Sequence, residues 1–166
     1  MSTTAPATDV VVRRMRWWDV EGAQIVETRV FQQTPWPPET FWSELAGVPA
    51  SRHYLVAESR GQIVGYAGLM VVGREADIQT LAVAPESQRQ GVGSRLLNSL
   101  LDEAGARDCA RVTLEVAADS EAAQGLYLRR GFTVMARRSN YYGPGADALI
   151  MRIRLGRSGQ PEGGSS

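Results

Sequence analysis

The sequence contains no lysine, because all 18 of its Lys and Arg residues are arginine. Schiff-base chemistry is therefore excluded, and so is a P-loop, which needs a phosphate-binding lysine. The single cysteine, Cys109, permits no intramolecular disulfide. No charged segment leads into an apolar stretch as in a secretory signal, and no apolar run approaches the roughly 18 residues of a membrane span. These absences predict a cytoplasmic protein with no membrane partner.

Charge of one sign does not dominate either. The 18 arginines are balanced by 18 acidic residues, so no overall field favours nucleic acid, and we expect no direct nucleic-acid partner. The length of 166 residues and a hydrophobic content of 43% suit one domain with one core. The oligomeric state is left open.

Residues 1–8 and 156–166 are small and polar, which predicts flexible tails around one folded domain at residues 9–155. Three β-rich runs, "HYLVAES", "QIVGYAGLMVV" and "EADIQTLAV", are separated by turn signals and predict an antiparallel meander. A helix at 93–106, a strand "RVTLEV", a helix at 120–130 and a hairpin around "GPG" follow. The pattern predicts a mixed α/β fold with helices on both faces of one sheet.

The N-terminal part is expected to hold two helices. Asp19 is expected to help start the first, which would carry Ile25, Val26 and Val30 toward the core, and "TPWPPETF" ends it and starts the second. The four tryptophans, Trp17, Trp18, Trp36 and Trp42, are expected mostly in the core. Trp36 lies between prolines in a loop, where a rigid aromatic could equally form the wall of an acceptor channel.

The stretch "QRQGVGSRLL" has two glycines directly before a strongly amphipathic helix. A P-loop is excluded by the missing lysine, and a dinucleotide fingerprint would need a third glycine where Leu96 stands. Bare backbone and the free N–H groups of a first helical turn favour an anion such as a pyrophosphate. The alternative is an ordinary strand-to-helix turn in which glycine satisfies φ.

The segment "LAVAPESQRQGVGSRLL" resembles the acetyl-CoA signature of the GCN5-related N-acetyltransferases, whose Gln/Arg-x-x-Gly-x-Gly/Ala pattern is met by Gln88, Gly91 and Gly93. "TLEVAADSEAAQGLYLRRGF", "ARRSNYY", "DALIM" and "TPWPPETF" resemble blocks of the bacterial ribosomal-protein alanine N-acetyltransferases, the RimI type. The resemblance covers residues 18–151. It implies a mixed sheet of about six to seven strands and the use of acetyl-CoA as co-substrate, without a metal.

The resemblance also implies a cofactor site. The pantetheine arm would be lined by the main chain of Leu81, Ala82 and Val83. The pyrophosphate would be held by six consecutive residues, Arg89, Gln90, Gly91, Val92, Gly93 and Ser94. Ser120 departs from the pattern, because the RimI type usually has asparagine there. Serine or the preceding Asp119 can still cap the following helix, but serine reaches less far toward coenzyme A.

Two side chains match the catalytic residues of the RimI type. Glu115 in "TLEV" would be the base, acting through water, and Tyr127 in "GLYLRRGF" would return a proton to the departing thiolate. Taken without the resemblance, Glu115 could be a solvated strand residue and Tyr127 a packing aromatic. Tyr141 and Tyr142 are expected at the end of a strand, where the resemblance implies that Tyr141 borders the peptide entrance.

Other reactive residues are less promising. A Ser/His/Asp triad would depend on His53, which is expected to be a surface or packing residue, and Cys109 is expected to be a small structural residue. Arg137 and Arg138 are equally consistent with solvated charges and with binding groups.

The resemblance implies acetylation of a protein N-terminus, that of the N-terminal alanine of ribosomal protein S18. Two alternatives stay open: acetylation of lysine or a small amine, and a coenzyme A-binding module without catalysis.

Overall fold

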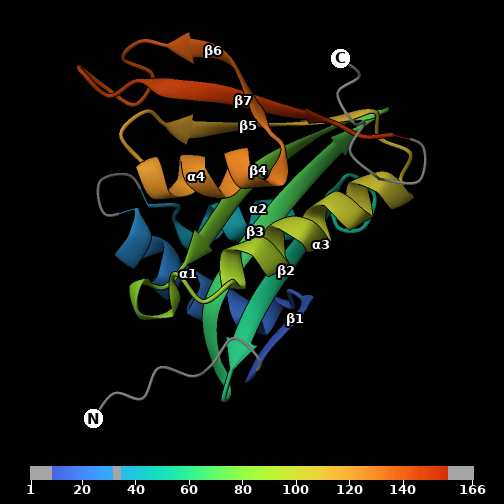
Figure 1. Ribbon diagram of the computed structural model, residues 1–166. Helices are drawn as coiled ribbons and strands as arrows, with labels where there is room; N and C mark the ends of the chain where they lie inside the picture. Colours follow the sequence, from blue (N-terminus) through green and yellow to red (C-terminus); the bar gives the residue numbers. More distant parts are fainter. Residues whose placement is uncertain (1–8, 32–34, 157–166) are drawn as a thin grey trace. The chain divides into compact units, whose positions relative to one another are not determined.

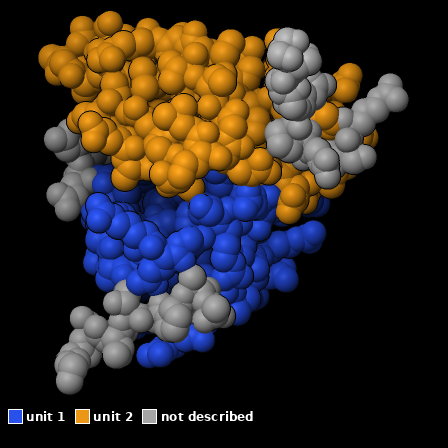
Figure 2. All heavy atoms as spheres, viewed as in Figure 1, with its two compact units in different colours: residues 1–70, 79–100 blue, residues 71–78, 101–166 orange. Residues whose placement is uncertain are grey.

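The structure is a computed structural model that describes residues 9–31 and 35–156. The predicted tails, apart from Gly156, lie outside these ranges. The chain divides into two compact units, shown in different colours in Figure 2. The first comprises the described residues up to Met70 together with Gln79–Leu100, and the second comprises Val71–Ile78 together with the described residues from Leu101.

The described residues form seven strands and four α-helices (Figure 1). The strands are β1 (Val10–Arg14), β2 (Arg52–Ser59), β3 (Gln62–Val72), β4 (Glu75–Val83), β5 (Arg111–Ala117), β6 (Thr133–Arg138) and β7 (Ala148–Arg154). The helices are α1 (Val20–Val30), α2 (Pro38–Leu45), α3 (Val92–Ala106) and α4 (Glu121–Arg130), with 3-10 turns at Trp17–Asp19 and Pro85–Ser87. The hydrogen-bonded strand order is β1-β2-β3-β4-β5-β7-β6, which confirms the predicted mixed α/β sheet.

The meander is present as predicted. β1 pairs antiparallel with β2, and β2 pairs antiparallel with β3. β3 and β4 are neighbours in the sheet and are joined by only two residues, Gly73 and Arg74, a length that permits an antiparallel connection alone. No helix in the described ranges is long and apolar enough to cross a membrane.

Helices cover both faces of β3 in the first unit. The Phe41 ring of α2 packs edge-on against Tyr66, with ring centroids 5.3 Å apart. A Cβ atom on the preceding residue, Gly65, would lie 3.2 Å from Leu96 of α3. Because successive strand residues point to opposite faces, α2 and α3 lie on opposite faces, as predicted.

Two predictions about apolar residues in the first unit were wrong. Ile25 is 57% exposed, because the buried stripe of α1 is formed by Val20, Ala23 and Val26. Trp17 and Trp18 are 66% and 60% exposed and pack edge-on against each other in the turn before α1. Trp42 is 45% exposed, because its neighbour Phe41 takes the core-facing position of α2.

In the second unit, β5, β7 and β6 form consecutive antiparallel pairs (Figure 1). α4 ends at Gly131, whose φ of +110° is the left-handed conformation in which glycine commonly terminates a helix. All six residues of β6 are exposed, and a register shift between Val134 and Ala136 interrupts its pairing. Tyr141 and Tyr142 lie in the turn after β6, not at a strand end as predicted.

Candidate active site

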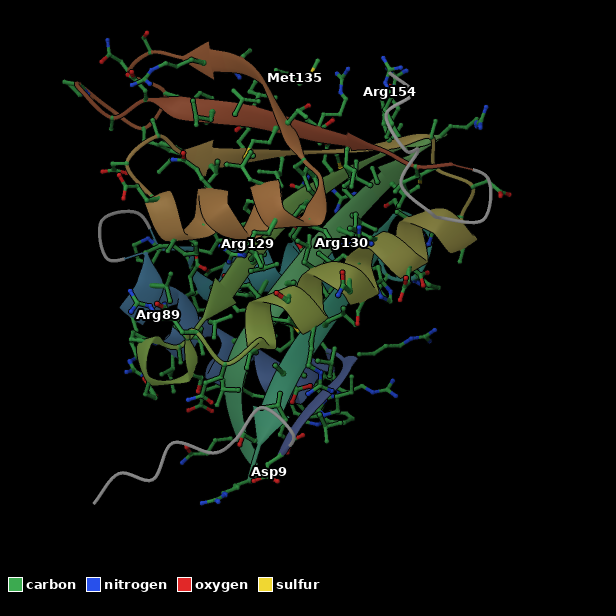
Figure 3. The ribbon with its side chains drawn as sticks, viewed as in Figure 1. Asp9, Arg89, Arg129, Arg130, Met135 and Arg154 are labelled. Atoms are coloured by element: carbon green, nitrogen blue, oxygen red, sulfur yellow. The ribbon has the colours of Figure 1, made fainter. Side chains whose placement is uncertain are left out.

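The glycine stretch lies between β4 and α3 in the first unit. The Gln88 side chain donates a hydrogen bond of 3.0 Å to the Val83 carbonyl, which ties the loop to the end of β4. Gly91 has φ +83°, and a Cβ atom there would meet nothing within 4 Å, so glycine is required by the backbone conformation and not by crowding. Arg89 also has positive φ and its side chain is exposed on this loop (Figure 3).

The first turn of α3 can hold an anion. α3 begins at Val92 and carries no acidic residue in its first turn, so the N–H groups of residues 92–94 stand at a helix N-terminus whose own first turn has no negative side chain. Main-chain donors of this kind suit a pyrophosphate without lysine. The main-chain donors at residues 92–94 therefore suit an anion such as the pyrophosphate of coenzyme A.

Trp36 is held by the core of the first unit. Its main-chain N–H donates a 3.0 Å hydrogen bond to the Glu27 carboxylate, and its ring packs edge-on against Phe41 at 5.5 Å. Glu27, only 2% exposed, also accepts a hydrogen bond from the Tyr66 hydroxyl, which in turn accepts one from Thr80. Burial raises the pKa of Glu27 above its ordinary value.

Glu115 lies in β5 with its side chain exposed, in the second unit. Its carboxylate is 3.6 Å from Nη1 of Arg138. Hydrogen bonding to Glu115, followed by the negative charge of its carboxylate, raises the pKa of Tyr141. The Arg138 guanidinium lies over the Tyr141 ring, 4.5 Å from its centroid. Arg138 therefore contacts both Glu115 and Tyr141.

Three further groups of the second unit, Tyr127, Tyr142 and Asp77, also have raised pKa values. Tyr127 of α4 is 6% exposed, and burial, with a smaller effect of Tyr142, raises its pKa, so the phenol stays protonated near neutral pH. Burial, with Glu115 second, raises the pKa of Tyr142. Burial also raises the pKa of Asp77, to which the carboxylates of Glu75 and Glu115 contribute. The second unit thus brings Glu115, Tyr141 and Tyr142 together with a neutral phenol.

Comparison with known proteins shows the family of the chain. The sequence model of the acetyltransferase (GNAT) family matches residues 14–132. The chain belongs to the acetyltransferase (GNAT) family. It is 39% identical over 155 residues to N-alpha-acetyltransferase RimI of Mycobacterium tuberculosis, covering 90% of this chain and 95% of the relative. It is 36% identical over 142 residues to the [ribosomal protein bS18]-alanine N-acetyltransferase of Escherichia coli strain K12, covering 82% and 92%.

A solved structure agrees with the GNAT assignment. The crystal structure of the ribosomal-protein-S18-alanine N-acetyltransferase from Escherichia coli has a TM-score of 0.77 and 30% sequence identity to this chain. The match covers 95% of this chain and 96% of that one.

Three other residues considered in the sequence, Ser120, His53 and Cys109, lie at a helix N-cap or in buried positions. Ser120 stands at the N-cap of α4, but neither it nor another side chain makes a capping hydrogen bond there. His53 is buried in β2 and Cys109 is buried, as expected of packing residues. The described residues contain no group of three or more His, Cys, Asp or Glu that could hold a metal ion.

The structure shows contacts of two residues, Arg138 and Glu27, that the sequence does not predict. The sequence is equally consistent with Arg138 as a solvated charge and as a binding group, and it does not predict a role for Glu27. Glu27 sits one position after Val26 on the buried stripe of α1, so a charged residue on an apolar face was the available signal. For Arg138 no local signal exists, because its contact with Glu115 depends on the pairing of three strands.

Proposed function

We propose that this chain is an acetyl-CoA-dependent N-alpha-acetyltransferase that acetylates a protein N-terminus, that of the N-terminal alanine of ribosomal protein S18, in the cytoplasm. The names of the M. tuberculosis and E. coli relatives support this acceptor. The observation that carries the proposal is the cluster around Glu115, where a carboxylate, two tyrosines and an arginine meet at an exposed strand position.

An α-amino acceptor suits a carboxylate base. Its ordinary pKa near 8 leaves on the order of a tenth of it neutral at pH 7, whereas a lysine amine with a pKa near 10.4 is neutral to well under a thousandth. An α-amine therefore needs modest help, which an exposed carboxylate and a water can give. Glu115 takes the amine proton through water as the nitrogen bonds to the acetyl carbon.

The departing thiolate needs a proton when its bond to the acetyl carbon breaks. Tyr127 supplies it, because its phenol carries a proton near neutral pH, and the phenolate left behind regains a proton after the thiol has departed. Tyr141 and Trp36 contact the acceptor in this proposal. Acetyl-CoA supplies the acetyl group as a thioester, and no metal takes part.

The cofactor is held by the residues that the family resemblance assigns. The N–H groups from Arg89 to Ser94 bind the pyrophosphate, and the main chain of Leu81 to Val83 binds the pantetheine arm, with Val83 already tied to the loop by Gln88. Ser120, at the N-cap of α4 without a capping hydrogen bond, keeps its hydroxyl available to coenzyme A.

The acceptor is tested by mass spectrometry. The protein is incubated with acetyl-CoA and either a peptide matching the N-terminus of ribosomal protein S18 or the same peptide with a blocked N-terminus and an internal lysine. We expect one acetyl group on the α-amine of the first peptide and none on the second. Labelling of lysine alone would show the alternative lysine acetyltransferase, and cofactor binding without any labelling would show a non-catalytic module.

A further inference from the structure

Arg138, at the end of β6, contacts both Glu115 and Tyr141. We infer that Arg138 is a positioning residue for acetyl transfer, acting through these two side chains and not on the substrate itself. The inference rests on the proposed function, because it takes Glu115 as the base. It adds a residue to which neither the family pattern nor the sequence gave a role.

The strand pairing explains how the two side chains meet. Glu115 of β5 is opposite Ile150 of β7, and Ile150 is opposite Ala136 of β6. Arg138 is two residues beyond Ala136, so it points to the same face as Glu115. Its partner on β7 is Ala148, a small residue over which a long arginine side chain can reach toward β5.

The contacts hold Glu115 from two sides. The guanidinium is 3.6 Å from the carboxylate and lies over the Tyr141 ring, 4.5 Å from its centroid, and Glu115 in turn raises the pKa of Tyr141. Arg138 therefore orients the tyrosine as well as the base. Without Arg138, the Tyr141 ring would lose this contact and keep its edge-on contact with Tyr142.

Stability alone does not explain this arrangement. The side chains of Arg138 and Glu115 are 53% and 36% exposed, and ion pairs this exposed contribute little to folding. A general base, in contrast, works only when its carboxylate is held within hydrogen-bond reach of the proton that it takes. The effect of Arg138 should therefore appear in catalysis and not in the melting temperature.

Arg137 provides a matched control on the same strand. As the adjacent residue it points to the opposite face, and its guanidinium bonds Asp147 at 2.8 Å. Asp147 also accepts a hydrogen bond from the Asn140 main chain, so the turn keeps a support when Arg137 is replaced. Arg137→Met thus removes one charge from β6 without touching Glu115 or Tyr141.

The first experiment measures kcat, the acceptor KM and the acetyl-CoA dissociation constant for three variants. We expect Arg138→Met to lower kcat/KM for the S18 peptide about tenfold, with unchanged acetyl-CoA affinity and a melting temperature within about 2 °C of wild type. Arg138→Lys should recover part of the loss, because it keeps the charge without the planar stacking. Arg137→Met should behave as wild type. Equal activity of Arg138→Met and wild type would overturn the inference, as would a loss confined to the melting temperature.

The second experiment repeats Arg138→Met in the Glu115→Gln background. If Arg138 acts in part through Glu115, its replacement should lower kcat/KM clearly less than tenfold there, because an amide forms no ion pair and only the contact with Tyr141 remains. A tenfold loss in both backgrounds would refute the inference while leaving Glu115 as the base. If Glu115→Gln alone retains wild-type kcat, the proposed function of Glu115 fails instead, so the two failures are distinguishable.

Discussion

Tyr54 and Gly68 stand directly opposite each other in the antiparallel pairing of β2 with β3. The tyrosine ring lies over the glycine, because a Cβ atom at position 68 would be 2.2 Å from two ring carbons of Tyr54. Tyr54 is also among the largest fully buried side chains of the first unit. The close packing of this core therefore depends on the absence of a side chain at one strand position.

Gly68→Ala is expected to lower the free energy of unfolding by about 2 kcal/mol, since the added methyl group forces Tyr54 out of its packed position. Backbone entropy alone predicts the opposite sign, because glycine in a strand is less favourable than alanine. Urea denaturation followed by circular dichroism gives the value. A variant as stable as wild type would mean that Tyr54 can move freely.

Gly125→Ala in α4 is the matched control for this prediction. There the added methyl group would meet only the terminal Nη1 of Arg129, at 2.9 Å, which is the mobile end of a long side chain. The gain in helix propensity should then raise the free energy of unfolding by about 0.5–1 kcal/mol. Opposite signs for the two glycine-to-alanine changes would separate packing from backbone entropy.

Arg13 and Asp19 give a prediction about pH. Asp19 is 5% exposed and accepts two hydrogen bonds from the Arg13 guanidinium, at 2.7 and 2.8 Å, which with the Arg16 main-chain N–H lower its pKa. Arg13→Met leaves this buried carboxylate without its charged partner. We expect the free energy of unfolding at pH 7 to fall by about 2 kcal/mol.

The sign of the pH dependence follows from the lowered pKa. The contribution of Asp19 is complete above the ordinary aspartate pKa near 3.9 and is lost as pH falls through the lower folded-state value. The stability difference between wild type and Arg13→Met should therefore be largest at neutral pH and should shrink below about pH 4. Denaturation curves across this range measure it, with the exposed neighbour Arg14→Met as a control. A difference that grows at low pH would contradict the assignment.

Local patterns in the sequence were enough to predict most of the fold. Apolar periodicity and turn residues act over a few positions, which is why the meander, the helix at 93–106 and the end of α4 at Gly131 were predicted correctly. Trp17, Trp18 and Trp42 were predicted wrongly, because residue type alone does not say which side of a turn or helix faces the core. Trp17 and Trp18 lie in the turn before α1 and pack edge-on against each other instead of entering the core.

The residues of the candidate site likewise differ in whether a local motif contains them. Glu115, Tyr127 and the glycine stretch belong to local motifs, so a resemblance could assign them, and these assignments stay predictions. The Arg138 contact could not be predicted, because it needs the register of β5, β7 and β6, which a hairpin turn of unknown geometry sets. The contact of Glu27 with Trp36 likewise joins a helix to a loop nine residues away.

Glu27 gives a third prediction, which concerns how the free energy of unfolding changes with pH. Burial raises the pKa of Glu27 in the folded protein, so the folded protein keeps the carboxyl proton to a higher pH than the unfolded chain does. The contribution of Glu27 to the free energy of unfolding therefore falls as pH rises from the ordinary glutamate pKa near 4.3 to the folded-state pKa. Glu27→Gln should remove this slope while still accepting a hydrogen bond from Trp36. Denaturant midpoints from pH 4 to pH 8 show it, and an unchanged slope would contradict the prediction.

Glu27→Leu is the informative partner variant. It leaves the Trp36 N–H and the Tyr66 hydroxyl without their acceptor inside the core, at an expected cost of about 1–3 kcal/mol relative to Glu27→Gln. Because a glutamine side chain has a single acceptor oxygen, Glu27→Gln keeps an acceptor for the Trp36 N–H alone, and equal stability of the two variants would show that this hydrogen bond does not matter for folding.

Tyr127 gives the last prediction, which concerns catalysis. Its buried phenol stays protonated across the usual assay range because burial raises its pKa, so activity should not decline at high pH through loss of this proton. Tyr127→Phe keeps the ring that packs edge-on against Phe132 and removes only the hydroxyl. We therefore expect an unchanged melting temperature and acetyl-CoA affinity with a kcat lower by about 100-fold. Stopped-flow turnover and isothermal titration separate these quantities, and a kcat equal to wild type would leave Tyr127 as a packing residue and require another proton donor for the thiolate.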